Sequence, residues 1–242
     1  MTAGTLALAA PLFPLATFAV LAMGLSRHGR LAAALSTGAV AIALGTAATG
    51  LAVTTTGGEA TIEINWLTVG GRQLGAAVWL DPLNAVMATL VALVALVIFV
   101  YATGYMAEDP DRGRFFTMFS LFAGSMLLLV ESGDLLTLFV TWEIVGLCSY
   151  LLIGFWHNRP RVPAAATKAF IVTRLADLAL LAGILLLAGQ IGSTRIDTPL
   201  AAVRPGQLGG PGLLFGRLLL LGEVNARDGV VDPVDHPEEL GV

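Results

Sequence analysis

Residues 134–156 read DLLTLFVTWEIVGLCSYLLIGFW, an apolar run with one internal charge, Glu143. A helix needs roughly 20 mostly apolar residues to cross the hydrocarbon core of a bilayer, and this run is long enough. A charged glutamate near the middle of such a span is costly to bury, so it is rare there and usually functional. The stretch therefore predicts a membrane-spanning helix with a carboxyl group deep in the bilayer.

Further apolar runs lie on both sides of this stretch. Hydrophobic residues make up 56% of the 242 residues, charged residues only 12%, and the mean hydropathy is +0.83. A soluble domain, in contrast, is about a quarter charged. The first run lacks a preceding basic residue and is long for a signal peptide, so we interpret it as a retained helix. The sequence predicts an all-α membrane protein with about six transmembrane helices, over residues 5–25, 31–52, 82–106, 114–131, 134–156 and 164–189.

The loop at residues 53–81 has a different pattern. Ile62, Ile64 and Trp66 alternate with Glu63 and Asn65, which is the two-residue period of a β-strand. Two glycines at 70–71 fit a tight turn, after which residues 74–79 can return as a second strand. We expect a small β-hairpin on the bilayer surface.

Composition excludes several classes of function. The net charge of −4 provides no basic field for nucleic acid. A single cysteine, Cys148, excludes an internal disulfide framework, and we expect it to be a small packing residue beside Gly146. The three histidines lack metal-ligand spacing, and no glycine-rich nucleotide-binding motif or cysteine cluster is found, so we expect no metal and no bound cofactor.

Arginines are distributed unevenly between the two sets of loops. The loops after the first, third and fifth predicted helices contain six arginines, whereas those on the other side contain three: Arg27, Arg30, Arg112, Arg114, Arg159 and Arg161 against Arg72, Arg195 and Arg204. Cytoplasmic loops are enriched in Lys and Arg. We therefore expect the first set in the cytoplasm and the N-terminus outside.

Four ionisable residues lie inside the predicted spans, away from their end residues, and are the candidate site. Glu143 has no basic residue one turn away on its own helix, so burial favours its neutral form and suits it to take up and release a proton. Arg174 and Asp177 share a helix face at i,i+3, either as a structural pair or as part of a proton path, and lie at a depth from which they could approach Glu143. Lys168, the only lysine, either extends to the interface or belongs to the proton path. The alternative for Glu143 is a protonated, hydrogen-bonded structural residue.

Glu131 and Asp134 flank the tight turn that precedes residues 134–156. We expect both to be solvated at the outer surface.

Several of these residues belong to recognisable motifs. Residues 141–156, TWEIVGLCSYLLIGFW, resemble a helix motif of the largest antiporter-like subunit of respiratory complex I, subunit L in bacteria and chain 5 in mitochondria. Supporting matches occur in the same order: DPL at 81–83, YM at 105–106, RFF at 114–116, and KAFIVTR at 168–174 followed by Asp177. The resemblance covers roughly residues 61–190. It leaves 1–60 as N-terminal helices with the start of the hairpin loop, and 191–242 as a Gly/Pro-rich loop and an acidic tail.

The resemblance implies a role in proton translocation coupled to quinone reduction elsewhere in NADH-quinone oxidoreductase. Glu143 matches the family's glutamate, which pairs with a lysine on a later, broken helix, and Lys168, Arg174 and Asp177 match family positions. Expected partners are the other membrane-arm subunits and the lipid bilayer, with no direct NADH binding and no redox site in this chain. The expected location is the bacterial inner (plasma) membrane.

Members of this family are much longer and continue beyond this point with an apolar helix that bears lysine. Here residues 213–221 form a short apolar stretch that carries Arg217, and residues 223–242 are polar and acidic, which is typical of a disordered tail. The sequence is compatible with a truncated copy of the subunit. It is also compatible with a subunit of a multi-subunit cation/proton antiporter, or with a structural or assembly element that moves no protons.

Overall fold

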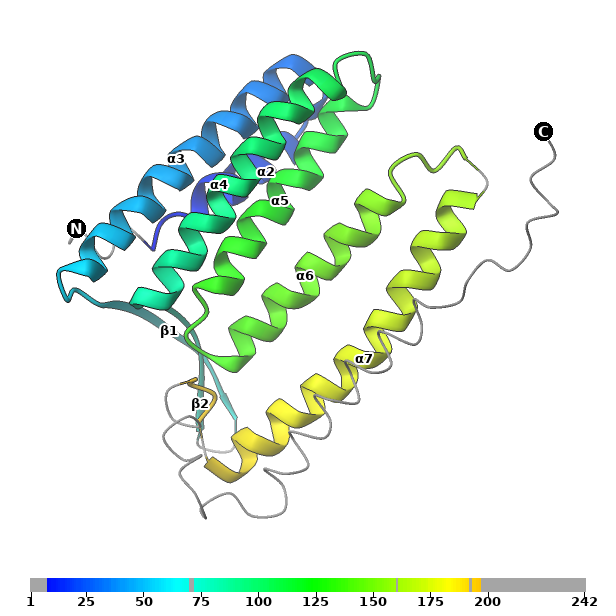
Figure 1. Ribbon diagram of the computed structural model, residues 1–242. Helices are drawn as coiled ribbons and strands as arrows, with labels where there is room; N and C mark the ends of the chain where they lie inside the picture. Colours follow the sequence, from blue (N-terminus) through cyan, green and yellow to red (C-terminus); the bar gives the residue numbers. More distant parts are fainter. Residues whose placement is uncertain (1–7, 70–71, 160, 192, 197–242) are drawn as a thin grey trace, which may run out of the picture.

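The computed structural model describes residues 8–69, 72–159, 161–191 and 193–196, and it shows a helical bundle with one β-hairpin (Figure 1). The described helices are α2 (Leu12–Ala22), the 3-10 helix η1 (Leu25–Arg27), α3 (Gly29–Thr55), α4 (Pro82–Tyr105), α5 (Arg112–Val130), α6 (Leu135–Ile153) and α7 (Arg161–Ile191). Five of them, α3 to α7, are long and apolar enough to cross a bilayer. The predicted architecture, mostly α-helical with a small hairpin, is confirmed, and the chain is a multi-pass membrane protein. Residues 213–221 and the acidic tail lie outside the described residues.

The first predicted span, 5–25, differs from the structure. Its described helix, α2, has only 11 residues, and residues 1–7 are not described. Proline is tolerated only in the first turn of a helix, so Pro11 and Pro14 place the start of α2 at Leu12. Gly24, with a φ of 127°, separates α2 from η1. The two prolines and the glycine are helix-breaking signals in the sequence, but the length and hydropathy of the run favoured a longer helix.

The helices α2 to α5 pack around an aromatic core. Phe99 of α4 stacks on Phe119 of α5 with ring centroids 4.5 Å apart, and Phe116 is fully buried beside them. The buried face of α3 consists of small residues, which allow close helix approach. In Figure 1, α6 lies beside α5, and α7 is the outermost helix, packed against α6.

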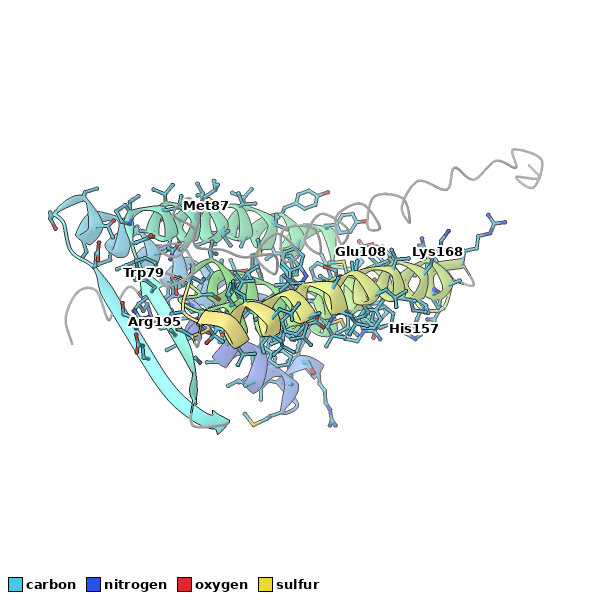
Figure 2. All side chains as sticks on the ribbon, turned by 90° about the horizontal axis from the view of Figure 1, so that it is seen from below. Trp79, Met87, Glu108, His157, Lys168 and Arg195 are labelled. Atoms are coloured by element: carbon cyan, nitrogen blue, oxygen red, sulfur yellow. The ribbon has the colours of Figure 1, made fainter. Side chains whose placement is uncertain are left out.

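The hairpin consists of β1 (Ala60–Val69) and β2 (Arg72–Leu80), paired antiparallel. The register shifts between Asn65 and Leu67, so a bulge interrupts the predicted alternation. The predicted turn residues, 70–71, lie outside the described residues. Figure 2 shows Trp79 and Arg195 at the hairpin end of the bundle and Glu108, His157 and Lys168 toward the opposite end.

The prediction that Glu131 and Asp134 are solvated is wrong. Both side chains are buried, at 1% and 2% exposure, because β2 lies against the turn between α5 and α6. The amide of Trp79 donates to the carbonyl of Glu131 at 2.7 Å, and the amide of Ala77 donates to Oδ2 of Asp134 at 2.6 Å. Asp134 also caps α6 by accepting from the amides of Leu136 and Thr137, each at 2.9 Å.

The opposite end of the bundle carries the six arginines, which lie in the connections there or in the first turns of the helices that follow them. There, Arg114 Nη2 donates to the carbonyl of Phe155 at 2.5 Å, and the Trp156 indole donates to Oδ2 of Asp109 at 3.0 Å. The structure thus gathers these loops at one end of the bundle. Which compartment this end faces stays a prediction.

One close approach at that end gives a test of the packing. A Cβ added at Gly113 would overlap the carbonyl oxygen of Ser26, whereas nothing lies within 4 Å of one added at Gly104. Gly113→Ala should therefore destabilise the protein by about 1–3 kcal/mol through overpacking. The measurement is the thermal unfolding midpoint in detergent, with Gly104→Ala as the control. Equal midpoints for the two variants would contradict this packing.

Candidate functional site

The candidate site lies between α6 and α7, and the depth of Glu143 follows from where α6 begins. The cap at Asp134 fixes the first turn of α6 at Leu135. Glu143 is eight residues further on, which places it about 12 Å along the helix axis. The antiparallel neighbour α7 brings Arg174 and Asp177 to the same level, as the contacts below show.

Arg174 bridges carboxylates from two helices. Its Nη1 forms an ion pair with Oε2 of Glu143, and its Nη2 donates to the backbone carbonyl of Glu143 at 3.2 Å. The same Nη2 lies 3.6 Å from Oδ2 of Asp177 on its own helix. The structure thus brings together three of the four predicted site residues. With all groups ionised, one cation faces two anions and the cluster has a net charge of −1.

Two aromatic residues complete the cluster, and the sequence analysis missed both. The indole Nε1 of Trp142 donates to Oδ1 of Asp177 at 2.8 Å. The ring of Phe170 lies under the Arg174 guanidinium, 4.8 Å from centroid to Cζ, in a cation–π contact. The sequence signal for Phe170 was its i−4 spacing from Arg174. Trp142 and Asp177 lie on different helices, so no spacing rule relates them.

Gly146 provides the space for the guanidinium. A Cβ at this position would overlap Nη2 of Arg174. Because Gly146 is one turn from Glu143, the absent side chain leaves room for Arg174 to reach across from α7.

A pocket of about 250 Å³ opens beside the cluster. Its lining combines Glu143, Arg174 and Asp177 with apolar side chains, among them Phe139 and Leu178. Oε1 of Glu143 and Oδ2 of Asp177 are buried and accept no hydrogen bond within the described part of the chain. Each is therefore an acceptor position at which a proton can bind without displacing an existing hydrogen bond.

Lys168 is not part of this cluster. Its side chain is exposed. Lys168 lies six residues before Arg174 on α7, which places it about 9 Å farther from the hairpin along the helix axis. Both interpretations of Lys168 therefore stay predictions.

Cys148 is fully buried and forms no disulfide. Across the described ranges, no group of three or more His, Cys, Asp or Glu side chains is placed to hold a metal ion.

Comparison with family models gives two matches in consecutive parts of the chain. Residues 66–116 match the model of the N-terminus of chain 5 of NADH-ubiquinone oxidoreductase (complex I). Residues 132–227 match the transmembrane model of the NADH:quinone oxidoreductases and Mrp antiporters. The second match contains the whole Glu143–Arg174–Asp177 cluster.

Individual relatives agree with these matches. The chain is 50% identical over 112 residues to F(420)H(2) dehydrogenase subunit L of Methanosarcina mazei, covering 46% of this chain and 17% of that protein. It is 41% identical over 157 residues to NADH-quinone oxidoreductase subunit L of Mycobacterium tuberculosis, covering 65% of this chain and 25% of that protein. The chain therefore spans about a quarter or less of the length of these two relatives.

A solved structure shows the same fold. The Mrp complex from Dietzia sp. matches with a TM-score of 0.65 and 24% identity, over 94% of this chain and 24% of the matched chain. This likeness shows the fold, and the two family models and the named relatives show the family. The chain belongs to the family of antiporter-like membrane subunits that includes chain 5 and subunit L of the NADH:quinone oxidoreductases.

Proposed function

We propose that this chain is a proton-translocating membrane subunit of an NADH-quinone oxidoreductase, and that Glu143 carries the proton. The observation that supports this most is the Arg174 bridge, in which one partly buried cation is shared by two carboxylates on adjacent spans. Such a cluster has room for one more positive charge, and a proton is the smallest cation that can supply it. The low dielectric of the bilayer strengthens each interaction between charges, so the addition of one proton changes the free energy of the cluster significantly.

The geometry suggests the step. A proton that binds Glu143 neutralises it and weakens its ion pair with Arg174. The guanidinium then pairs more fully with Asp177, whose Oδ2 is already within 3.6 Å and whose Oδ1 is held by Trp142. When the proton leaves, Arg174 returns to Glu143. The arginine thus moves between two fixed anions while the proton is loaded and released.

The proposal assigns electron transfer to other subunits. The two relatives named above carry different electron donors in their names, F(420)H(2) and NADH, yet this chain matches part of each. A likeness to both fits a role that is independent of the donor. We therefore propose the other membrane-arm subunits as partners, no direct contact with NADH, and a location in the bacterial inner membrane with the N-terminus outside.

A second candidate is a subunit of a multi-subunit cation/proton antiporter. The description of the matched family model includes Mrp antiporters, and the Dietzia Mrp complex has the same fold. The two candidates differ in the ion that the complex moves. Proton uptake that requires a sodium gradient, and not quinone reduction, would favour the antiporter.

The first test replaces the proton carrier. In vesicles that contain the chain with its co-purifying membrane subunits, Glu143→Gln should reduce proton flux, read with a pH-sensitive dye, to that of vesicles lacking the complex, because the amide has no titratable proton. Glu108→Gln, at an exposed loop position, should leave the flux unchanged. Normal flux in Glu143→Gln with normal membrane insertion would reject the assignment.

The second test concerns the shared cation. Arg174→Gln leaves the carboxyl groups of Glu143 and Asp177 without their cation and should lower the free energy of unfolding by about 1–3 kcal/mol. Adding Glu143→Gln to that variant should recover part of the loss, since one carboxyl group that would have to take up a proton in the folded state is then absent. Thermal unfolding midpoints in detergent provide the measurement.

The matched control is Arg159→Gln, because Arg159 stacks on Trp156 at an exposed site. That variant should lose less than about 1 kcal/mol. Equal losses at the two arginines would mean that Arg174 is not the shared cation of the cluster.

A further inference from the structure

Glu131, outside the cluster described above, is a carboxyl group that is almost completely buried. It follows the last residue of α5 and is only 1% exposed. Both of its carboxyl oxygens are buried, and neither has a hydrogen-bond partner among the described residues. Asp134, three residues later, is equally buried, but its carboxylate accepts hydrogen bonds from Ala77, Leu136 and Thr137. The turn thus holds one carboxyl with several donors and one with none.

The hairpin is hydrogen-bonded to the turn that holds Glu131. Strand β2 is joined to the turn between α5 and α6 by the Trp79 amide, which donates to the Glu131 carbonyl at 2.7 Å, and by the Gly133 amide, which donates to the Ala77 carbonyl at 2.8 Å. The backbone of Glu131 is therefore part of the contact between the hairpin and the turn.

Among the described residues, no basic side chain forms a hydrogen bond with the Glu131 carboxyl. Asp134 lies in the same turn, and Asp81 follows β2 as the N-cap of α4, so both are acidic. Arg195 pairs in a backbone bridge with Asp134, and its guanidinium forms an ion pair with Glu63 of β1. In the described part of the chain, an ionised Glu131 would therefore be a buried anion without a hydrogen-bonded cation. Desolvation raises the pKa of Glu131 from its ordinary value of 4.5 to about 8.

We propose that Glu131 is a proton-binding site that couples docking of the β-hairpin on the α5–α6 turn to the pH on that side of the membrane. When protonated, Glu131 is neutral and can stay buried beneath β2. When the proton is lost, the buried charge favours an opened hairpin in which water reaches the carboxylate. The proposal does not depend on proton transfer at Glu143, because Glu131 follows the end of α5 whereas Glu143 lies within α6, about 12 Å from its start.

The sign of the pH dependence follows from linkage. The docked form keeps a proton up to about pH 8, whereas the opened form, in water, loses it above about pH 4.5. Docking is therefore strongest below pH 4.5 and weakens as the pH rises toward 8. Within that window one proton is released on opening, so the opening equilibrium should increase about tenfold per pH unit.

Hydrogen–deuterium exchange of the full chain in lipid nanodiscs tests this. The amides of Trp79 and Gly133 should open roughly ten- to a hundredfold more at pH 8 than at pH 6, after correction for intrinsic exchange. In Glu131→Gln, which keeps the shape and removes the titration, opening should be the same at both pH values. Glu59→Gln, an exposed residue just before β1, should behave like the wild type.

A second measurement covers the case in which Glu131→Gln fails to fold. Infrared spectra of the Glu143→Gln chain, with glutamate isotopically labelled, should show a protonated glutamic acid at pH 7 that ionises near pH 8. Exchange that is independent of pH in the wild type, a glutamine variant with the wild-type pH dependence, or no such protonated glutamic acid would each overturn the proposal.

Discussion

The shared guanidinium of Arg174 is the interaction on which the arrangement of α6 and α7 depends. Helix α7 packs against α6 and leaves large apolar side chains such as Leu185 and Leu186 exposed. In a lipid environment those apolar contacts supply little net force between helices. The ion pair from Arg174 to Glu143, together with the Trp142 bond to Asp177, is polar and cannot be replaced by lipid. The same bonds that orient α7 thus hold the three ionisable groups together.

A cluster of two carboxylates and one guanidinium can hold two helices together and still take up a proton. A one-to-one pair would be neutral and would gain nothing from a proton. Two anions with one cation leave one acid incompletely paired, and in a low dielectric such imbalance is costly. Gly146 leaves the space that the guanidinium occupies, and the adjoining pocket gives Oε1 of Glu143 an unoccupied acceptor position. Structure and proposed chemistry therefore rest on the same few side chains.

Local patterns in the sequence predicted much of the fold and of the cluster. The long apolar runs gave the spans, the alternation around Glu63 gave the hairpin, and the i,i+3 spacing gave the Arg174–Asp177 pair. What periodicity could not give was contact between segments distant in the chain. Trp142 on α6 donates a hydrogen bond to Asp177 on α7. Strand β2 packs against the turn that holds Glu131, and Glu131 is buried although it lies at a helix end beside a polar turn. Pro11, Pro14 and Gly24 indicate the correct bounds of the first helix, but the length and hydropathy of the apolar run favoured a longer one.

The central claim is that Arg174 holds Glu143 ionised within the bilayer and that a proton can take its place. Infrared spectroscopy of the labelled glutamate carboxyls in lipid membranes measures this most directly, in the Glu131→Gln background so that the other buried acid does not contribute. The account predicts an ionised Glu143 at neutral pH when Arg174 is present and a protonated Glu143 in Arg174→Gln. A Glu143 that keeps the same protonation state with and without Arg174 would contradict it.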